Sequence, residues 1–222
     1  MPEPIWTDVD EYLTTTLIPA DPVLDAVMSA NKAAGLPAID VTAAQAQFLQ
    51  MLVHLVSATR VLEIGTLGGY STIWLARALP HDGKLITLEY EEKHAQVALK
   101  NIADAGLSRI VELRQGRAAD SLAQLQAENA EPFDLIFIDA DKPNNPVYLE
   151  WALKFSHPGT FIVVDNVIRD GKISDASSTD PSITGTRTMF EQMGANPRLK
   201  ATALQTVGAK GYDGFALALV IS

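Results

Sequence analysis

Cysteine is absent from this chain of 222 residues. Its absence excludes disulfide bonds, thiolate metal sites and cysteine nucleophiles together. A reducing compartment suits such a chain, and we therefore expect the protein to be cytoplasmic.

Basic residues are scarce: 17 Lys and Arg stand against 27 Asp and Glu, which gives a formal net charge of -10. Affinity for nucleic acids is built mainly on lysine and arginine side chains that neutralise phosphates. We therefore expect no nucleic-acid partner and take a small molecule as the substrate.

Long apolar runs are missing as well, since none approaches the roughly 20 residues that span a bilayer. The first eight residues hold acids and prolines where a signal peptide would carry a basic flank and an apolar core. We expect neither export nor a membrane partner. Hydrophobic residues make up 47% of the chain and charged residues 20%, proportions that are typical of a globular protein.

From residue 60 onward, apolar strands alternate with helices, which is the pattern of a doubly wound parallel sheet. The sequence predicts an α/β, Rossmann-like fold with a mostly parallel sheet, helices on both faces and an antiparallel last strand. The strands are expected at residues 60–64, 84–89, 110–115, 135–139, 160–165, 201–207 and 215–221. The helices are expected at residues 70–78, 91–105, 118–128, 145–155 and 186–193.

Helices are also expected before the first strand, at residues 9–16, 22–34 and 43–57. We predict one domain over residues 1–222, in which residues 1–57 form a helical cap over the site and residues 58–222 form the Rossmann-like core. Two loops complete the prediction. The polar residues 169–185 predict a mobile wall of the substrate pocket, and residues 208–214 predict the turn of a hairpin.

The stretch from Phe133 to Lys142 is where we expect the chemistry. Its residues Leu135–Ile138 are all apolar, as in a strand that is buried on both faces of a parallel sheet. Asp139, Asp141 and Lys142 follow directly. Ligands of an open α/β sheet bind beyond the carboxyl ends of the strands, so these charged groups are expected at the rim of the ligand crevice.

A glycine-rich turn, Gly65-Thr66-Leu67-Gly68-Gly69, joins the first strand to its helix. Glycines let the backbone approach a ligand closely. The spacing is not the G-x-G-x-x-G fingerprint of dinucleotide sites, so a pyrophosphate grip has little support. The alternative is a turn that only connects strand and helix.

Two acids favour a ligand site over that alternative. Glu63 lies two residues before the turn, where its carboxylate could be oriented by the turn or face a cationic ligand group. Glu89 ends the second strand, where an acid can accept both hydroxyls of a ribose, although it could also be a solvated acid beside Glu91 and Glu92. Ala118, after the third strand, is small enough to let its backbone pass near an adenine ring.

Asp139 ends the fourth strand and Asp165-Asn166 end the fifth, so three oxygen ligands converge if these strands are neighbours. Carboxylate and amide oxygens form a hard site that suits Mg²⁺, Ca²⁺ or Mn²⁺ and is poor for zinc. The alternative is that Asp165 and Asn166 only end a strand and begin a turn.

These residues resemble the class I S-adenosylmethionine-dependent O-methyltransferases of the caffeoyl-CoA and catechol type, which use a divalent cation. The resemblance covers about residues 42–221. It rests on three motifs, Glu63-Ile64-Gly65-Thr66-Leu67-Gly68-Gly69-Tyr70-Ser71, Phe137-Ile138-Asp139-Ala140-Asp141-Lys142 and Val164-Asp165-Asn166-Val167.

The resemblance implies a role for each motif residue. The methyl donor would be contacted by the backbone near Val41 and by Glu63, Gly65, Ser71, Glu89, Ala118, Asp139, Asp141 and Tyr148. The metal, Mg²⁺ first and Ca²⁺ or Mn²⁺ as alternatives, would be held by Asp139, Asp165 and Asn166. Lys142 would be the catalytic base beside Asp139, and the protein would be a homodimer.

The implied reaction is methyl transfer to a hydroxyl of a small phenolic acceptor, expected to be a vicinal diphenol. A phenol of pKa about 10 is largely protonated at neutral pH, so a metal and a base are needed to ionise it. The alternative for Lys142 is a surface lysine that pairs with Asp139 or Asp141.

The acceptor is less defined than the donor. After the fifth strand this chain has Arg169-Asp170, where plant members of the family tend to carry an aromatic residue. Arg187 is either a charge on the substrate side or the partner of Glu191 in a helical ion pair. Two other functions stay open, an NAD-type oxidoreductase and a ligand-binding relative without catalysis.

Overall fold

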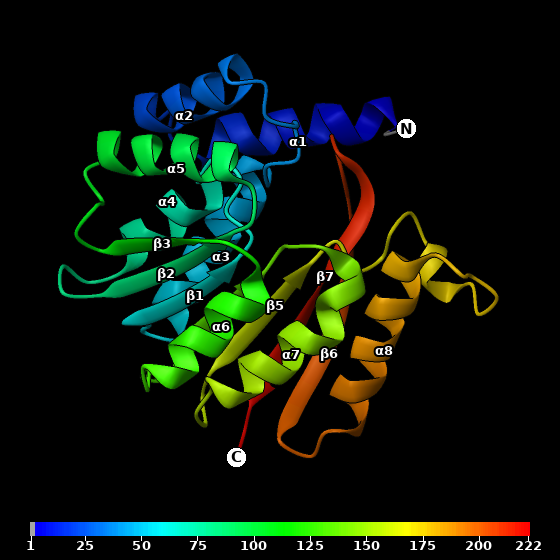
Figure 1. The fold of residues 1–222 in the computed structure, drawn as a ribbon. Helices are drawn as coiled ribbons and strands as arrows, with labels where there is room; N and C mark the ends of the chain where they lie inside the picture. Colours follow the sequence, from blue (N-terminus) through cyan, green and yellow to red (C-terminus); the bar gives the residue numbers. More distant parts are fainter. Residues whose placement is uncertain (1–2) are drawn as a thin grey trace.

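The computed structural model describes residues 3–222 and has a seven-stranded sheet in the order β3-β2-β1-β4-β5-β7-β6 (Figure 1). The first two residues of the expected helical cap lie outside the described range. The strands are β1 (Arg60–Ile64), β2 (Lys84–Glu89), β3 (Val111–Gln115), β4 (Leu135–Ile138), β5 (Phe161–Asp165), β6 (Leu199–Gly208) and β7 (Gly211–Val220). Strands β1 to β5 pair in parallel, and β7 runs antiparallel to both β5 and β6. The predicted α/β fold with an antiparallel last strand is confirmed.

Helices cover both faces of this sheet, as predicted. They are α1 (Pro4–Leu17), α2 (Pro22–Ala33), α3 (Ala43–Leu55), α4 (Tyr70–Ala78), α5 (Glu92–Asp104), α6 (Ala118–Ala127), α7 (Asn145–Lys154) and α8 (Pro181–Ala195). Two buried apolar clusters show the layers: α2 to α5 pack against one face of the strands, and α6 to α8 pack against the other. The alternation of side chains along each strand produces this division, because successive residues point to opposite faces.

The structure corrects the predicted bounds at three places. Helix α1 begins at Pro4 and not at residue 9, and α8 begins at Pro181, inside the segment that was predicted to be a loop. In both helices proline occupies the first turn, where a missing N–H costs nothing. Asp180 caps α8 by accepting a hydrogen bond from Ser182 N at 2.8 Å. The hairpin turn is also tighter than predicted, because β6 ends at Gly208 and β7 begins at Gly211.

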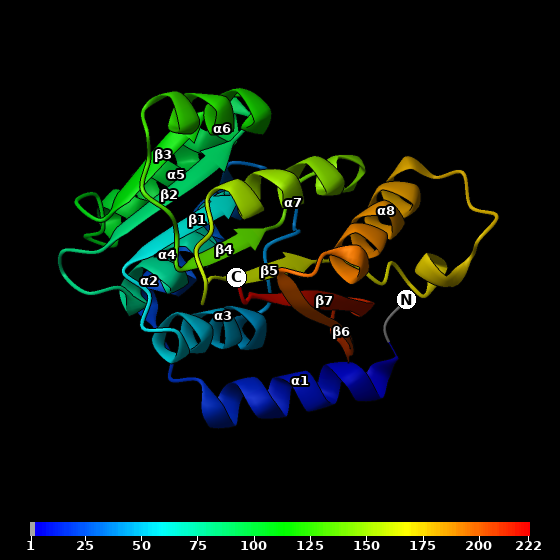
Figure 2. The ribbon, with the colours of Figure 1, turned by 90° about the horizontal axis from the view of Figure 1, so that it is seen from below.

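The N-terminal helices lie on the α3 side of the sheet, and α1 runs along the outside of the molecule past α3 and β6 (Figure 2). None of its residues is buried. No helix within residues 3–222 combines the length and the apolar character that a membrane span needs.

The order of the strands fixes where a ligand can bind. From β1 the chain proceeds to β2 and β3 on one side, and then returns to add β4 and β5 on the other side. Such a switch in strand order opens a crevice at the carboxyl ends of the strands. The motifs predicted from the sequence follow the carboxyl ends of β1, β4 and β5, so the fold brings them to this crevice.

Candidate functional site

A cavity of about 800 Å³ lies at the carboxyl ends of β1, β2 and β4. Ten of the residues predicted for the site line it: Val41, Gly65, Ser71, Glu89, Ala118, Asp139, Asp141, Lys142, Tyr148 and Asn166. Two predicted residues, Glu63 and Asp165, do not line this cavity. The volume is that of a site for a drug-sized ligand or cofactor.

The glycine-rich turn begins where β1 meets β4. Gly65 has φ of 102°, and a Cβ atom on it would lie 2.1 Å from the carbonyl oxygen of Asp139. Asp139 N in turn donates to the carbonyl oxygen of Ile64 at 2.8 Å. Only glycine fits here, because both the backbone conformation and the neighbouring strand exclude a side chain. The close approach sets Asp139 directly beside the turn.

Glu63 is fully buried behind the cavity wall. Its carboxylate accepts hydrogen bonds from the hydroxyls of Ser71 at 2.6 Å, Thr87 at 2.7 Å and Thr72. Burial raises the pKa of Glu63 to about 7, against the effect of these three donors. Glu63 therefore fixes the first turn of α4, including Ser71, which does line the cavity.

Glu89 at the end of β2 is held rigidly in the cavity wall. One of its carboxylate oxygens accepts from Leu67 N at 2.8 Å and Thr66 N at 3.2 Å, and the other accepts from Glu91 N at 2.9 Å. His94 Nδ1 lies 3.5 Å from the second oxygen. The alternative of a solvated acid is wrong, because Glu89 is buried and tied to the glycine turn.

Asp141 and Tyr148 form a second polar pair in the cavity. The Tyr148 hydroxyl donates to one carboxylate oxygen of Asp141, and Asn144 donates to the other. Burial, together with the neighbouring Asp141 carboxylate, raises the pKa of Tyr148 well above its ordinary value. Two neutral donors thereby orient the Asp141 carboxylate within the cavity.

Lys142 is buried, so the predicted alternative of a surface lysine is wrong. Its ammonium donates to Oδ1 of Asp139 at 2.9 Å. The ion pair with Asp139, which was part of the surface-lysine alternative, is therefore present although the lysine is buried. The backbone around Lys142 is fixed by α8, since a Cβ atom on Gly185 would lie 2.6 Å from the carbonyl oxygen of Lys142. Lys142 and Asp139 thus form one ion-paired unit in the wall of the cavity.

Asp165 is the last residue of β5, and Asn166 follows it, near this unit. Asp165 is 2% exposed, and burial together with the nearby Asp139 carboxylate raises its pKa to about 7. Asn166 has a positive φ of 56°, which is tolerated better by asparagine than by most residues. The end of β5 thus has a buried carboxylate that is repelled by a second one, Asp139.

The donor set fits a hard divalent cation. Within residues 3–222 no group of three or more His, Cys, Asp or Glu side chains is placed to hold a metal ion. Asp139 and Asp165 supply two carboxylates, so the Asn166 amide would have to be the third protein ligand. An all-oxygen set of this kind suits Mg²⁺, Ca²⁺ or Mn²⁺. A cation there would also relieve the repulsion that raises the pKa of Asp165.

A second cavity of about 290 Å³ adjoins the first and reaches the β6–β7 turn. Asp40, Val41 and Asn166 line both cavities, while Asp165 and Lys210 line only the second. Neighbouring atoms that displace water lower the pKa of Lys210, against the opposite effect of Asp40, Asp165 and Asp139. Asp40, His94 and Lys210 are absent from the predicted site, because none of them belongs to a sequence motif.

Arg169 lines the first cavity. Its backbone N–H donates to Asp213 Oδ1 at 3.1 Å, as does that of Ile168 at 2.9 Å, so β7 holds this loop. Arg187 does not line the cavity; its guanidinium donates to the carbonyl oxygen of Asp175 at 2.7 Å. Neither predicted alternative for Arg187 is observed. Its hydrogen bond instead connects α8 to the preceding loop.

Comparison with known proteins agrees with this geometry. A family model described as O-methyltransferase matches residues 18–220. Catechol O-methyltransferase from Niastella koreensis is 54% identical over 216 residues, which are 97% of this chain and 98% of the relative. Among solved structures, an O-methyltransferase from Bacillus cereus in complex with S-adenosylhomocysteine (SAH) is 56% identical, with a TM-score of 0.96 and coverage of 97% and 98%.

A third similar protein is the O-methyltransferase TomG from Streptomyces achromogenes, solved in complex with S-adenosylmethionine. It is 44% identical, with a TM-score of 0.96 over 100% of both chains. A family model that spans nearly the whole chain and relatives of this identity lead to one conclusion. The chain belongs to the O-methyltransferase family.

Proposed function

We propose that this protein transfers a methyl group from S-adenosylmethionine to a hydroxyl of a small phenolic acceptor, and that this acceptor is a vicinal diphenol. The observation that carries the proposal is the meeting of the glycine turn, Asp141 and the Asp139–Lys142 pair in one cavity. The relative named catechol O-methyltransferase and the neighbour bound to SAH support the same reaction.

The donor would lie along the glycine turn. Glu89, whose carboxylate is fixed by the turn, suits the ribose hydroxyls, and Ala118 leaves room for the adenine ring. Gly65, Ser71, Asp141 and Tyr148 would surround the methionine end, with the Val41 backbone above it. Glu63 would act through Ser71, because it is buried behind the wall that Ser71 forms. Asp139 would face the donor and the acceptor together.

The acceptor would lie beside Asp139, Lys142 and Asn166, with Arg169 at its edge. Asp139, Asp165 and Asn166 would hold a divalent cation. Such a cation would lower the pKa of an acceptor hydroxyl and orient two vicinal oxygens. The buried Lys142 would accept the hydroxyl proton as the general base. The acceptor oxygen then attacks the methyl carbon, the carbon–sulfur bond breaks, and its electron pair stays on sulfur.

The cavity also supplies proximity. Asp139 follows β4 and touches the glycine turn, so the donor and the acceptor would be held on two sides of the same backbone contact. Fixing two reactants in line removes much of the entropic barrier of a bimolecular reaction.

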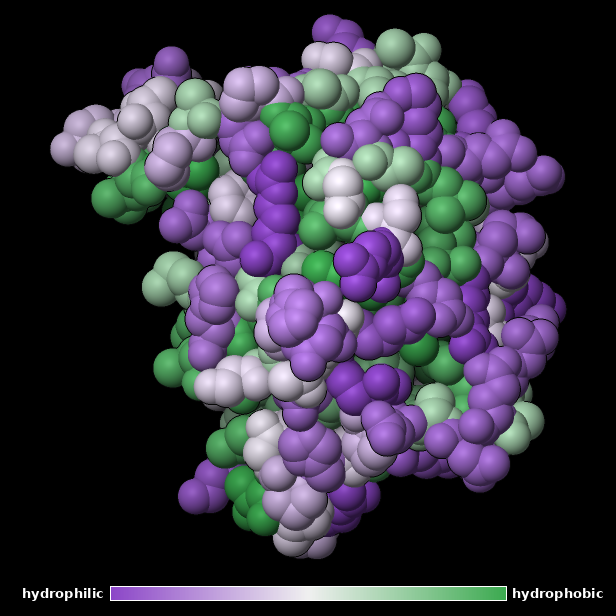
Figure 3. Space-filling view, turned by 90° about the vertical axis from the view of Figure 1, so that its left-hand side faces the viewer, coloured by the Kyte–Doolittle hydropathy of each residue, from purple (hydrophilic) through white to green (hydrophobic). Residues whose placement is uncertain are grey.

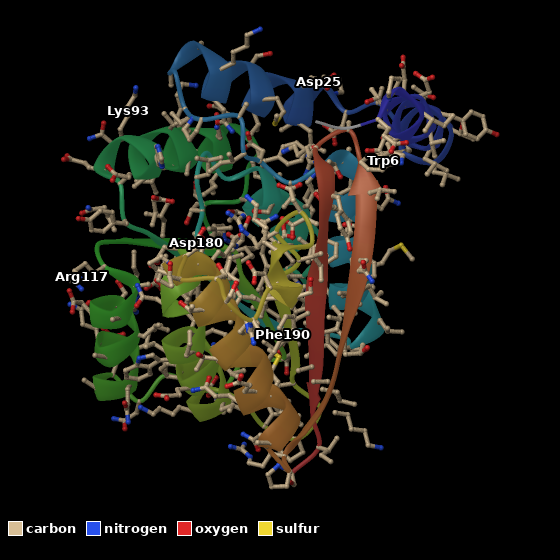
Figure 4. All side chains as sticks on the ribbon, turned by 90° about the vertical axis from the view of Figure 1, so that its right-hand side faces the viewer. Trp6, Asp25, Lys93, Arg117, Asp180 and Phe190 are labelled. Atoms are coloured by element: carbon tan, nitrogen blue, oxygen red, sulfur yellow. The ribbon has the colours of Figure 1, made fainter. Side chains whose placement is uncertain are left out.

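We further propose that the chain is one domain and acts as a homodimer. Helix α1 exposes Ile5, Val9, Tyr12 and Leu17, a set of large apolar residues that recur along the helix. Figure 4 shows α1 nearly end on, beside the ends of β6 and β7, and Ala209 N donates to Asp10 Oδ2 there. The face seen from the left-hand side of Figure 1 has hydrophilic and hydrophobic residues interspersed (Figure 3). A second copy would cover the apolar side chains of α1.

Methylation of a catechol panel tests the proposed function. The protein is incubated with S-adenosylmethionine, Mg²⁺ and either catechol, 3,4-dihydroxybenzoate or phenol, with and without EDTA. We expect SAH and the mono-methyl ether from the two diphenols only, and loss of turnover with EDTA. Turnover that EDTA leaves unchanged would contradict the metal-assisted reaction.

Two binding measurements separate the remaining alternatives. Saturable binding of NAD without binding of S-adenosylmethionine would favour the oxidoreductase. Binding of S-adenosylmethionine without methylation of any acceptor in the panel would favour a ligand-binding relative.

A further inference from the structure

Asp40 is a buried carboxylate in the segment that connects α2 to α3. It is 8% exposed, whereas the preceding residue, Ile39, is 67% exposed. Both of these residues and Val41 line the main cavity as well as the adjoining one. The segment of residues 39–41 therefore forms a wall between the two cavities, and Asp40 points into the protein from that wall.

The Asp40 side chain is joined to the glycine turn by two buried amides. Asn31 Nδ2 donates to Asp40 Oδ1 at 2.8 Å, and Asn101 Nδ2 donates to Asn31 Oδ1 at 3.0 Å. Asn101 Nδ2 also lies 2.8 Å from the carbonyl oxygen of Gly68, to which it donates. This chain of contacts, which we name the Asp40 network, links α2, the wall segment, α5 and the glycine turn.

The Asp40 network packs directly against Gly68 in the glycine turn. A Cβ atom on Gly68 would lie 1.9 Å from Asn31 Oδ1, so a side chain at Gly68 would displace the amide that holds Asp40. The glycine at this position thus has a second purpose besides a close approach to a ligand.

Burial of the polar groups in the Asp40 network has a desolvation cost. Desolvation raises the pKa of Asp40 although the hydrogen bond from Asn31 opposes this effect. Asn31 and Asn101 are each 3% exposed. Buried polar groups that are fully bonded hold one arrangement of the backbone, because an unpaired group would cost more than the bonded network. The arrangement that is held here is the wall segment against the turn.

We propose that Asp40 is a positioning residue for the methyl donor, because its hydrogen bond from Asn31 fastens the wall segment to the glycine turn over the amino-acid end of the donor. This inference rests on the proposed function for the place of the donor. It predicts that loss of the hydrogen bond weakens binding of the amino-acid end of the donor and leaves binding of the adenosine end unchanged.

Two ligands and two substitutions test the proposal by titration calorimetry. SAH has the amino-acid end, and 5′-methylthioadenosine lacks it. For Asp40→Ala we expect roughly tenfold or greater weakening of SAH binding, as for loss of a buried hydrogen bond to a charged group, with 5′-methylthioadenosine within twofold of the parent protein. Asp40→Asn should bind SAH within about threefold, since its amide oxygen can still accept from Asn31.

The matched control is Asp82→Ala, which removes an exposed acid from the turn before β2 and should bind both ligands like the parent. Asn31→Ala should weaken SAH binding as Asp40→Ala does, and the double variant should lose no more than either alone. Amide hydrogen exchange adds a readout: SAH should protect residues 39–41 in the parent but not in Asp40→Ala.

Three results would overturn the proposal. The first is SAH binding by Asp40→Ala within twofold of the parent, and the second is equal weakening of both ligands. The third is a loss in Asp40→Asn as large as that in Asp40→Ala, which would assign the effect to charge. These measurements use neither acceptor nor metal, so their failure is distinct from a failure to methylate.

Discussion

The Lys142 ammonium lies 2.9 Å from Oδ1 of Asp139, and 7% of the lysine is exposed. This pair joins the proposed base to the proposed metal ligand, so the two roles are linked. A cation bound to Asp139 would compete with the Lys142 ammonium for the same carboxylate. Binding of the cation would therefore weaken the ion pair between Lys142 and Asp139.

Replacement of Lys142 by methionine should lower kcat by about 10²- to 10⁴-fold, the usual contribution of a general base. The KM for S-adenosylmethionine should stay within about threefold, because the proposed role of Lys142 is toward the acceptor and not toward the donor. Initial rates with catechol as acceptor measure both constants. Lys100→Met, which changes an exposed lysine on α5, is the matched control. An unchanged kcat for Lys142→Met would remove Lys142 from the reaction.

Local patterns in the sequence were sufficient for much of the fold and of the site. The apolar run Leu135–Ile138 and the glycine turn after Ile64 predicted strand ends within one residue, because both signals are local. Asp139, Asp141 and Lys142 were placed at the rim for the same reason, since the rule that ligands bind at strand ends needs only the strand.

The residues that were missed depend on contacts between distant parts of the chain. Asn31 and Asn101 are 70 residues apart and meet only when α2 packs beside α5. Asp40 has no signal of its own, because an acid in a connecting segment is usually solvated. The start of α8 was missed although Asp180-Pro181 is a helix-start signal, because the polar composition of the segment favoured a loop.

Metal affinity should depend on pH through Asp165. Burial and the Asp139 carboxylate raise the pKa of Asp165 to about 7, so its proton competes with a cation below that pH. We expect the affinity for Mn²⁺ to increase roughly tenfold per pH unit up to about pH 7 and to level above it. Electron paramagnetic resonance of free Mn²⁺ between pH 5.5 and about 8.5 measures this.

Asp165→Asn should weaken Mn²⁺ binding at least tenfold and remove the pH dependence, because the competing proton is gone. Asp180→Asn changes the cap of α8, away from the proposed ligands, and serves as the control. Equal Mn²⁺ affinity at every pH in the parent protein would exclude Asp165 as a titrating ligand.

Glu63 should make the protein less stable as pH rises toward neutrality. Its pKa is raised by burial from 4.5 to about 7, so between these values the folded state holds a proton that the unfolded state has lost. The free energy of unfolding should therefore fall by roughly 1–3 kcal/mol from pH 5 to pH 7 and level above the folded pKa. Urea unfolding at fixed pH values measures the change in the metal-free protein.

Glu63→Gln should reduce this fall in stability, because the amide does not titrate. Asp165 contributes in the same direction, so a part of the pH dependence should remain. Glu131→Gln, on an exposed acid, should leave the parent curve unchanged. A pH profile of Glu63→Gln that matches the parent would show that Glu63 is ionised in the folded protein throughout this range.

The apolar side chains of α1 should determine the oligomeric state. Tyr12 and Leu17 are each 66% exposed, and the helix has no buried residue. The double substitution Tyr12→Asp and Leu17→Asp should convert the proposed dimer to a monomer, because charges cannot be buried unpaired at an interface. Light scattering after size exclusion measures the mass. Glu11→Gln on the same helix is the control, and a dimer that survives the double substitution would place the interface elsewhere.

Gly65→Ala should weaken donor binding strongly. A methyl group at this position would lie 2.1 Å from the carbonyl oxygen of Asp139, and the positive φ of 102° adds strain for any side chain. Either β4 or the turn must shift, and both carry groups of the site. We expect SAH affinity to fall by more than roughly tenfold and the free energy of unfolding to fall by about 1–3 kcal/mol. Gly106→Ala, which has a positive φ but open space around its Cβ position, separates backbone strain from the clash. It should lose stability alone, and binding lost equally in both variants would argue against a specific contact between the turn and Asp139.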